Sequence, residues 1–145
     1  MYRVLLAIHS WNRWVVLLLL ATTFFVAITR KKWDATGDRL SRFLTISVDI
    51  QMLLGLALYV ILHLATSLAT PGTMSNSVAR FWAVEHAFGM IVAIALIHVG
   101  RVKVRKAVEE RKARTAAIFF GLALLMVLLT IPWPGLPYGR PLARL

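Results

Sequence analysis

The sequence predicts an all-α integral membrane protein, a four-helix bundle with up-down-up-down topology. Apolar residues make up 59% of its 145 residues, against about 45–50% in soluble domains. They gather in four segments, each close to the ~20 residues that cross a membrane as a helix. Because the connections are short, successive spans are expected to be antiparallel neighbours. We therefore expect a single transmembrane domain over residues 1–145, with spans at about 4–29, 43–64, 78–99 and 115–131.

The basic residues indicate how the spans are oriented. The net charge is +11, and 12 of the 17 Lys and Arg residues lie in two connections, 30–42 and 101–114. Such an excess marks the cytoplasmic connections of membrane proteins, so both termini are predicted to lie outside. The same charge predicts contact with membrane lipids that are anionic. It does not indicate nucleic-acid binding, because no soluble basic fold carries it.

The first span, 4–29, is polar in its first third and free of charge after it. His9 and Arg13 are four residues apart, so they share one face of the helix. We expect Arg13 to reach toward His9 or to pair with Glu85 across the bundle. A basic run from Arg30 follows the span and indicates that it is retained rather than cleaved as a signal peptide.

The second span, 43–64, contains Asp49 and Gln51 and is closed by His63. A carboxylate inside a membrane has to be protonated, paired or reached by water. Asp49 therefore starts a proton path, serves a quinone headgroup, or makes only a structural hydrogen bond to Thr45 or a neighbouring helix. The sequence leaves these readings open. A turn at 70–73 leads to the third span.

The third span, 78–99, carries Arg80, Glu85, His86 and His98, whereas the fourth, 115–131, has no ionisable residue. A charged residue at the bilayer centre costs at least ~2.5–3.5 kcal/mol on insertion scales, so the adjacent Glu85 and His86 indicate a function. His98, near the inner end of its span, is expected to meet lipid headgroups. Two prolines end the fourth span, and the basic tail after them is expected on the outer surface.

Depth along the helices brings polar residues of three spans into one outer layer. At a rise of ~1.5 Å per residue, His9 lies about 30 Å, His63 about 31 Å and His86 about 22 Å above the inner edge of its span. Asp49 and His98 lie about 10 Å and 4 Å above that edge, in the inner half. The predicted outer layer consists of His9, Arg13, His63, Arg80, Glu85 and His86.

Histidines that face one another from different helices can be the two axial ligands of a haem. We expect one haem b in the outer half of the bundle, bound non-covalently because no CxxCH attachment sequence is present. His9 with His86 is the first ligand pair, and His86 with His63 is the second. Arg13 and Arg80 suit the propionates. A copper or zinc site and a purely structural polar cluster remain alternatives.

Two glycines near this layer have a predicted role as well. Gly55 and Gly89 are small enough to admit a flat macrocycle between the helices. The alternative is that they only permit close helix packing.

Four motifs follow one another along nearly the whole chain. They are His9-Ser10-x-x-Arg13-Trp14, Gln51-x-x-x-Gly55-Leu56-x-Leu58-Tyr59, Arg80-Phe81-x-x-x-Glu85-His86 and Ile131-Pro132-Trp133-Pro134. In this order they resemble a family of small four-span bacterial membrane proteins labelled cytochrome b. The architecture is also similar to that of the HemJ-type protoporphyrinogen oxidases and the copper-resistance D proteins. The resemblance points by position to His9, Arg13, Glu85 and His86, and it implies a multi-pass protein of a bacterial inner membrane.

The residues and the resemblance together predict a membrane-embedded haem b protein in electron transfer, with quinol or a redox partner at the outer face. Three alternatives remain open: a haem-dependent porphyrinogen oxidase, a copper-handling membrane protein, and a non-catalytic membrane subunit or assembly factor. The last would belong to a larger membrane complex, and a homo-oligomer is equally compatible with the sequence. Whether the protein is an enzyme stays open with these alternatives.

Overall fold

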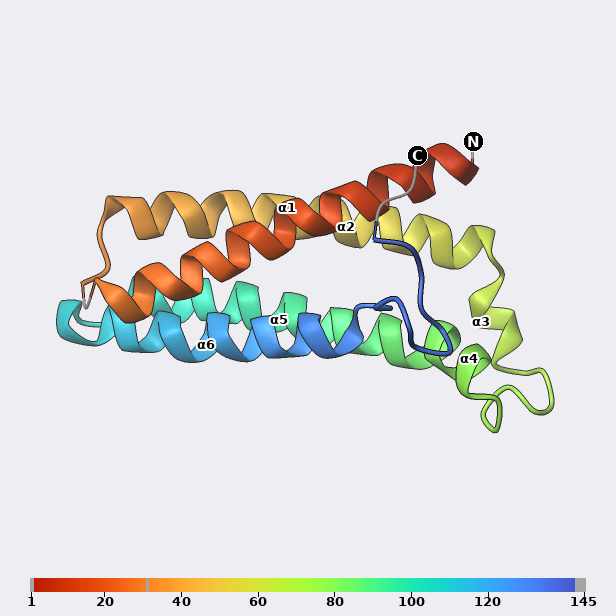
Figure 1. The fold of residues 1–145 in the computed structure, drawn as a ribbon. Helices are drawn as coiled ribbons and strands as arrows, with labels where there is room; N and C mark the ends of the chain where they lie inside the picture. Colours follow the sequence, from red (N-terminus) through yellow and green to blue (C-terminus); the bar gives the residue numbers. More distant parts are fainter. Residues whose placement is uncertain (1, 31, 143–145) are drawn as a thin grey trace.

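The computed structural model describes residues 2–30 and 32–142, and these form four long helices (Figure 1). They are α1 (Tyr2–Thr29), α2 (Ala35–Ile61), a composite third helix, and α6 (Glu109–Thr130). The third runs without a break through α4 (Ser77–Arg80), the π-helix η1 (Phe81–Glu85) and α5 (His86–Lys106). All four are long and apolar enough to cross a membrane. No strand occurs in the described part of the chain, and the predicted fold class is confirmed.

The helices run up and down in sequence order (Figure 1). α1 packs against both α2 and α6, and α5 packs against α6, whereas α2 meets α5 less extensively. α1 begins and α6 ends at the same end of the bundle. We call it the tail end, because the residues after α6 fold there, and we call the opposite end the loop end. The exposure of the tail end to the outside of a cell stays a prediction.

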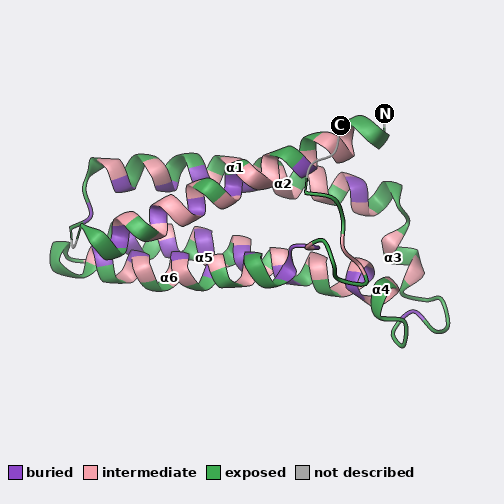
Figure 2. Ribbon diagram, viewed as in Figure 1, coloured by how far each residue is buried: buried purple, intermediate pink, exposed green. Residues whose placement is uncertain are grey.

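The observed helices are longer than the predicted spans at the loop end. α2 begins at Ala35 and α6 begins at Glu109, and α5 extends to Lys106. The apolar core alone set the predicted bounds, but the charged residues beside it continue the same helical turns. Large apolar side chains cover the outward faces, where Figure 2 shows the exposed residues, and these faces suit contact with lipid.

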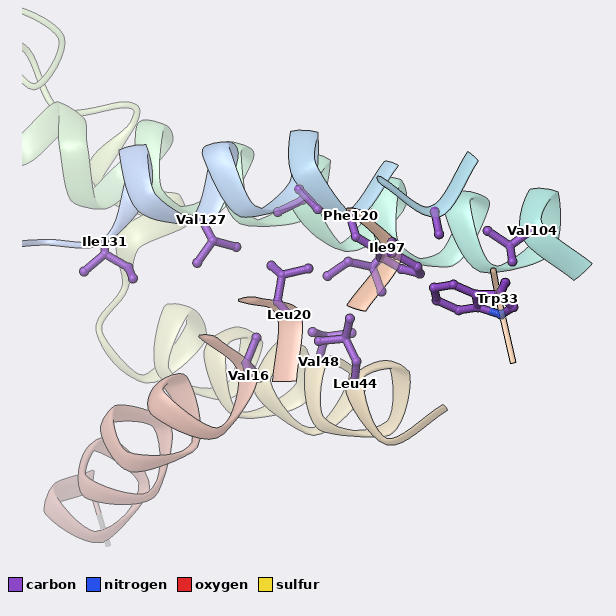
Figure 3. Packing of buried hydrophobic residues seen from close by; sticks show 14 residues of the cluster. Val16, Leu20, Trp33, Leu44, Val48, Ile97, Val104, Phe120, Val127 and Ile131 are labelled. Atoms are coloured by element: carbon purple, nitrogen blue, oxygen red, sulfur yellow. The ribbon is translucent and has the colours of Figure 1, made fainter. Parts of the chain in front are cut away.

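Small residues set the close packing of α5 on α6. α6 turns one narrow face inward, made of Ala113, Ala116, Phe120, Ala123, Val127 and Thr130. Small side chains matter in a membrane, because helices there associate through close van der Waals packing rather than through exclusion of water. Figure 3 shows how Leu20 of α1, Val48 of α2 and Ile97 of α5 complete the core around this face.

The first connection closes the loop end of the core instead of lying in solvent. Trp33 is only 7% exposed, and its ring stacks on that of Phe120 with the centroids 6.0 Å apart. Trp33 Nε1 donates a hydrogen bond to Asp38 Oδ1 at 2.8 Å. The glycine at position 37 is required, because a Cβ there would lie 2.8 Å from the Trp33 ring.

Asp34 begins α2 as its N-cap, and this contact predicts a pH dependence. Its Oδ1 accepts hydrogen bonds from the backbone N–H groups of Gly37 and Thr36. The Gly37 bond above all holds the pKa of this exposed carboxyl below its ordinary value. The cap therefore stabilises fully above the ordinary aspartate pKa, and the stabilisation is lost as the pH falls through the lowered one.

We expect Asp34→Ala to lower the thermal unfolding temperature at neutral pH and to unfold like the native chain once the carboxyl is protonated. Asp34→Asn is the matched control, because asparagine also caps helices but does not titrate. Thermal unfolding in detergent over a pH series measures both. An alanine variant as stable as the native chain at neutral pH would contradict the expectation.

Candidate functional site

A polar cluster at the tail end joins α1 to α5. The imidazoles of His9 and His86 lie close enough to interact electrostatically, and each also interacts with the guanidinium of Arg13. His9 and Arg13 come from the tail-end half of α1, and His86 is the first residue of α5. Three of the six residues of the predicted outer layer are thus brought together.

His86 is held by the last turn of α6. Its Nδ1 lies 2.8 Å from the backbone oxygen of Thr130. A carbonyl only accepts, so Nδ1 donates, and the neutral ring carries its lone pair on Nε2. Within the described residues nothing is hydrogen-bonded to Nε2. Metal-binding histidines are commonly oriented in this way, by a backbone carbonyl on the far ring nitrogen.

His9 is held by Gln51 of α2, a residue to which the sequence assigned no role. Gln51 Nε2 donates to the backbone oxygen of His9 at 3.0 Å and lies 3.3 Å from His9 Nε2. Gln51 Oε1 in turn accepts from Asn12 Nδ2 at 2.9 Å. The other ring nitrogen, His9 Nδ1, is buried and has no hydrogen-bond partner in the described part of the chain. Gly55 lies beside it, because a Cβ there would be 3.3 Å from His9 Cε1.

This network predicts the effect of replacing Gln51. Gln51→Leu removes the hydrogen bonds between α1 and α2 at His9 and Asn12, and we expect it to destabilise the fold by about 0.6–1.7 kcal/mol, the range of interhelical bonds in membranes. Leu53→Ala is the control, since Leu53 is 65% exposed. Unfolding in a denaturing detergent series compares the two, and a larger cost for Leu53→Ala would contradict the role of Gln51.

A π-helix directly precedes His86 and sets the partner of Glu85. In η1 the backbone N–H of His86 bonds to the carbonyl of Phe81, five residues back. Residues five apart therefore share a face, and Arg80 Nε lies 2.6 Å from Glu85 Oε1. The expected pairing of Arg13 with Glu85 is therefore wrong in this structure, where Glu85 pairs with Arg80. Arg80 also donates to the backbone oxygen of Met74, so its guanidinium is bound by Glu85 and Met74.

The C-terminal tail folds back over the cluster and is not a free surface segment (Figure 1). The Tyr138 ring stacks on Phe81 with the centroids 3.6 Å apart, and the Arg140 guanidinium lies 4.9 Å from the centre of the Trp82 ring. Arg13 Nη2 and Trp14 Nε1 both donate to the backbone oxygen of residue 142, at 2.7 and 2.8 Å. The tail thus ties the tail-end part of α1 to η1.

Aromatic rings flank His86 on the side of η1. The centroids of Phe81 and Trp82 lie 5.8 and 5.6 Å from that of His86. Trp82 Nε1 is buried, and no described residue accepts a hydrogen bond from it. The cluster therefore has two buried polar atoms without a hydrogen-bond partner among the described residues: His9 Nδ1 and, beside His86, Trp82 Nε1.

Besides Arg80 and Glu85, two more residues that were predicted to belong to the site lie outside the cluster. His63 lies after the end of α2, before the short helix α3 (Leu64–Ser67), in the left-handed conformation with φ 53° and with an exposed side chain. Gly89 does not admit a macrocycle, because a Cβ at this position would overlap the Thr130 Cγ2 methyl group. Gly89 serves the alternative role, close packing of α5 on α6.

The half of the bundle toward the loop end holds a pair that the sequence did not predict. His98 Nε2 lies 2.8 Å from Asp49 Oδ1, which links α5 to α2. His98 is therefore not simply a helix-end residue facing headgroups, and Asp49 is paired by a neighbouring helix. The two groups were predicted to differ in depth by about 6 Å, which a modest helix tilt removes.

The described residues contain no group of three or more His, Asp or Glu side chains placed to hold a metal ion. Two imidazoles are the donor set that they offer at the tail end. Comparison of the chain with family models, curated proteins and solved structures gives no match.

Proposed function

We propose that this chain is a haem b protein of a bacterial inner membrane that transfers electrons, with the haem at the tail end between His9 and His86. One observation carries the proposal: two imidazoles from different helices lie within electrostatic reach of each other, and each has a ring nitrogen that no described residue binds. His86 offers Nε2. His9 offers Nδ1, but Gln51 Nε2 donates to the His9 backbone oxygen and faces His9 Nε2, so in this arrangement Nε2 accepts and Nδ1 carries the proton. Ligation through Nδ1 therefore requires the ring to move this proton to Nε2.

The surroundings of the two imidazoles suit the rest of a haem. Arg13 interacts with both rings, and Arg140 of the tail lies over Trp82 beside them. Guanidiniums are strong donors to carboxylates such as propionates. Arg80, the other arginine expected there, is paired with Glu85, so Arg140 takes its place in the proposal. A bound haem would supply one-electron chemistry through its iron. The chain would orient the haem, exclude water from it and place positive charge beside its propionates.

The three alternative functions are supported by fewer observations than the haem proposal. A copper or zinc centre ordinarily needs three protein ligands, and the described residues gather two imidazoles. A porphyrinogen oxidase would use the same haem, and rescue of a strain lacking that activity would reveal it. A subunit or assembly factor without a cofactor would use the same polar groups for helix packing alone. The resemblance to small four-span cytochrome b proteins favours the first reading, with quinol as a candidate electron donor.

An optical spectrum tests the proposal. The protein is expressed with haem supplied, purified in detergent and reduced with dithionite. We expect a Soret band and the sharp visible bands of a low-spin haem with two imidazole ligands. A correctly folded protein that takes up no haem under these conditions would overturn the proposal, and copper or zinc in that protein, or co-purification with a larger complex, would select among the alternatives.

A further inference from the structure

We propose that the loop end of α6 binds an anionic glycerophospholipid, with its phosphate on Arg111 and Arg114 and an acyl chain along the helix. The observation is a surface hollow of ≈ 470 Å³ lined by Arg111, Arg114, Thr115 and Ile118. α6 begins at the loop end, opposite the cluster of His9 and His86 (Figure 1). This inference does not rest on the proposed haem.

The cations of the hollow are available for an anion. The guanidinium groups of Arg111 and Arg114 make no hydrogen bond or ion pair with any described residue, whereas the Lys112 ammonium beside them is paired with Glu109. A guanidinium binds a phosphate group through two parallel hydrogen bonds. Thr115 lines the same hollow and adds a hydroxyl that can donate to a third phosphate oxygen.

An apolar stripe continues from the hollow along α6. Positions 111, 115, 118, 122, 125 and 129 alternate in steps of four and three, which places them on one face of the helix. Ile118, Leu122, Leu125 and Leu129 are 50, 48, 53 and 65% exposed. Residues 115 to 129 extend about 21 Å, more than the ~15 Å of one leaflet.

The combination selects a lipid over other anions. A free phosphate or an acidic peptide would use the cations but would leave the apolar stripe without a role. A glycerophospholipid joins a phosphate to acyl chains at the depth where a span enters the headgroup region, and basic hollows at this depth bind anionic headgroups. The site is therefore assigned to an anionic lipid such as phosphatidylglycerol.

Native mass spectrometry of the protein tests the site. The protein is titrated with phosphatidylglycerol and, separately, with phosphatidylcholine of the same acyl chains, and the two affinities are compared. We expect preferential binding of phosphatidylglycerol, weakened roughly 30-fold in the double variant Arg111→Gln, Arg114→Gln, because two surface cations are lost. The matched control is Arg101→Gln, Arg105→Gln on α5, which removes two cations outside the hollow and should leave binding unchanged.

Two outcomes would overturn the site: an equal loss in both double variants, or equal binding of the two lipids. If the glutamine pair does not fold, Arg111→Lys with Arg114→Lys takes its place. This variant keeps the charge but loses the planar fork, so affinity should still fall below that of the native chain. Unchanged affinity in the lysine pair would contradict the phosphate contact.

Discussion

His86→Ala is expected to remove haem binding, and His9→Ala is expected to remove the low-spin spectrum. Each substitution deletes one of the two imidazoles that lie together at the tail end. Loss of groups that merely orient metal ligands costs 10–100-fold in affinity, so loss of a ligand should cost more than about 100-fold. Haem retained per protein and the reduced-minus-oxidised spectrum measure the effect.

His63→Ala and His98→Ala are the matched controls, because both residues lie outside the cluster. They should keep the native spectrum. His86 also binds the backbone of Thr130, so a structural role has to be separated from ligation. Imidazole added to His86→Gly should restore the spectrum if the ring is a ligand. A native spectrum in both His9→Ala and His86→Ala would contradict the assigned pair.

Gly89→Ala is expected to destabilise the bundle by about 1–3 kcal/mol, the usual cost of overpacking. The new Cβ would overlap Cγ2 of Thr130, whose Oγ1 donates to the backbone oxygen of Met126 at 2.7 Å and whose own backbone oxygen holds His86. The added methyl group therefore pushes apart α5 and α6 at the point where they position the imidazole. Unfolding in detergent measures stability, and haem content measures the site.

A second substitution separates this steric effect from any other role of Gly89. Thr130→Ser removes the clashing methyl group and keeps both the hydroxyl and the backbone carbonyl. In a double-mutant cycle, Gly89→Ala should cost clearly less in the Thr130→Ser background than in the native one. An equal cost in the two backgrounds would show that the methyl–methyl overlap is not the cause.

The sequence predicted the parts of the molecule that depend on regular helices. The four spans follow from hydropathy and length, because a helix must cover a fixed apolar thickness. Depth counting placed His9 and His86 in one layer because the rise per residue is constant. The same arithmetic put His98 and Asp49 in the same half, but their pairing needed the relative rotation of α2 and α5, which the sequence does not specify.

The errors have local physical causes. Glu85 pairs with Arg80 because the π-helix brings residues five apart onto one face, whereas the prediction assumed 3.6 residues per turn. The contacts of Arg13 and Trp14 with the tail were missed because the tail is irregular and its path is set by tertiary packing. Gln51 was missed because depth counting from Arg42 put it about 14 Å above the inner edge, against about 30 Å for His9. The structure begins α2 at Ala35, so the charged edge was a poor reference point for this helix.

The composition of the tail-end cluster has a consequence for biosynthesis. His9 lies on the first helix, its partner Gln51 on the second and His86 on the third, while Thr130 closes the last and the tail bonds to Arg13. The two imidazoles are both present once the third helix has been made, but the carbonyl that orients His86 comes only with the fourth. The cluster as described therefore forms only after α6 has packed against α5.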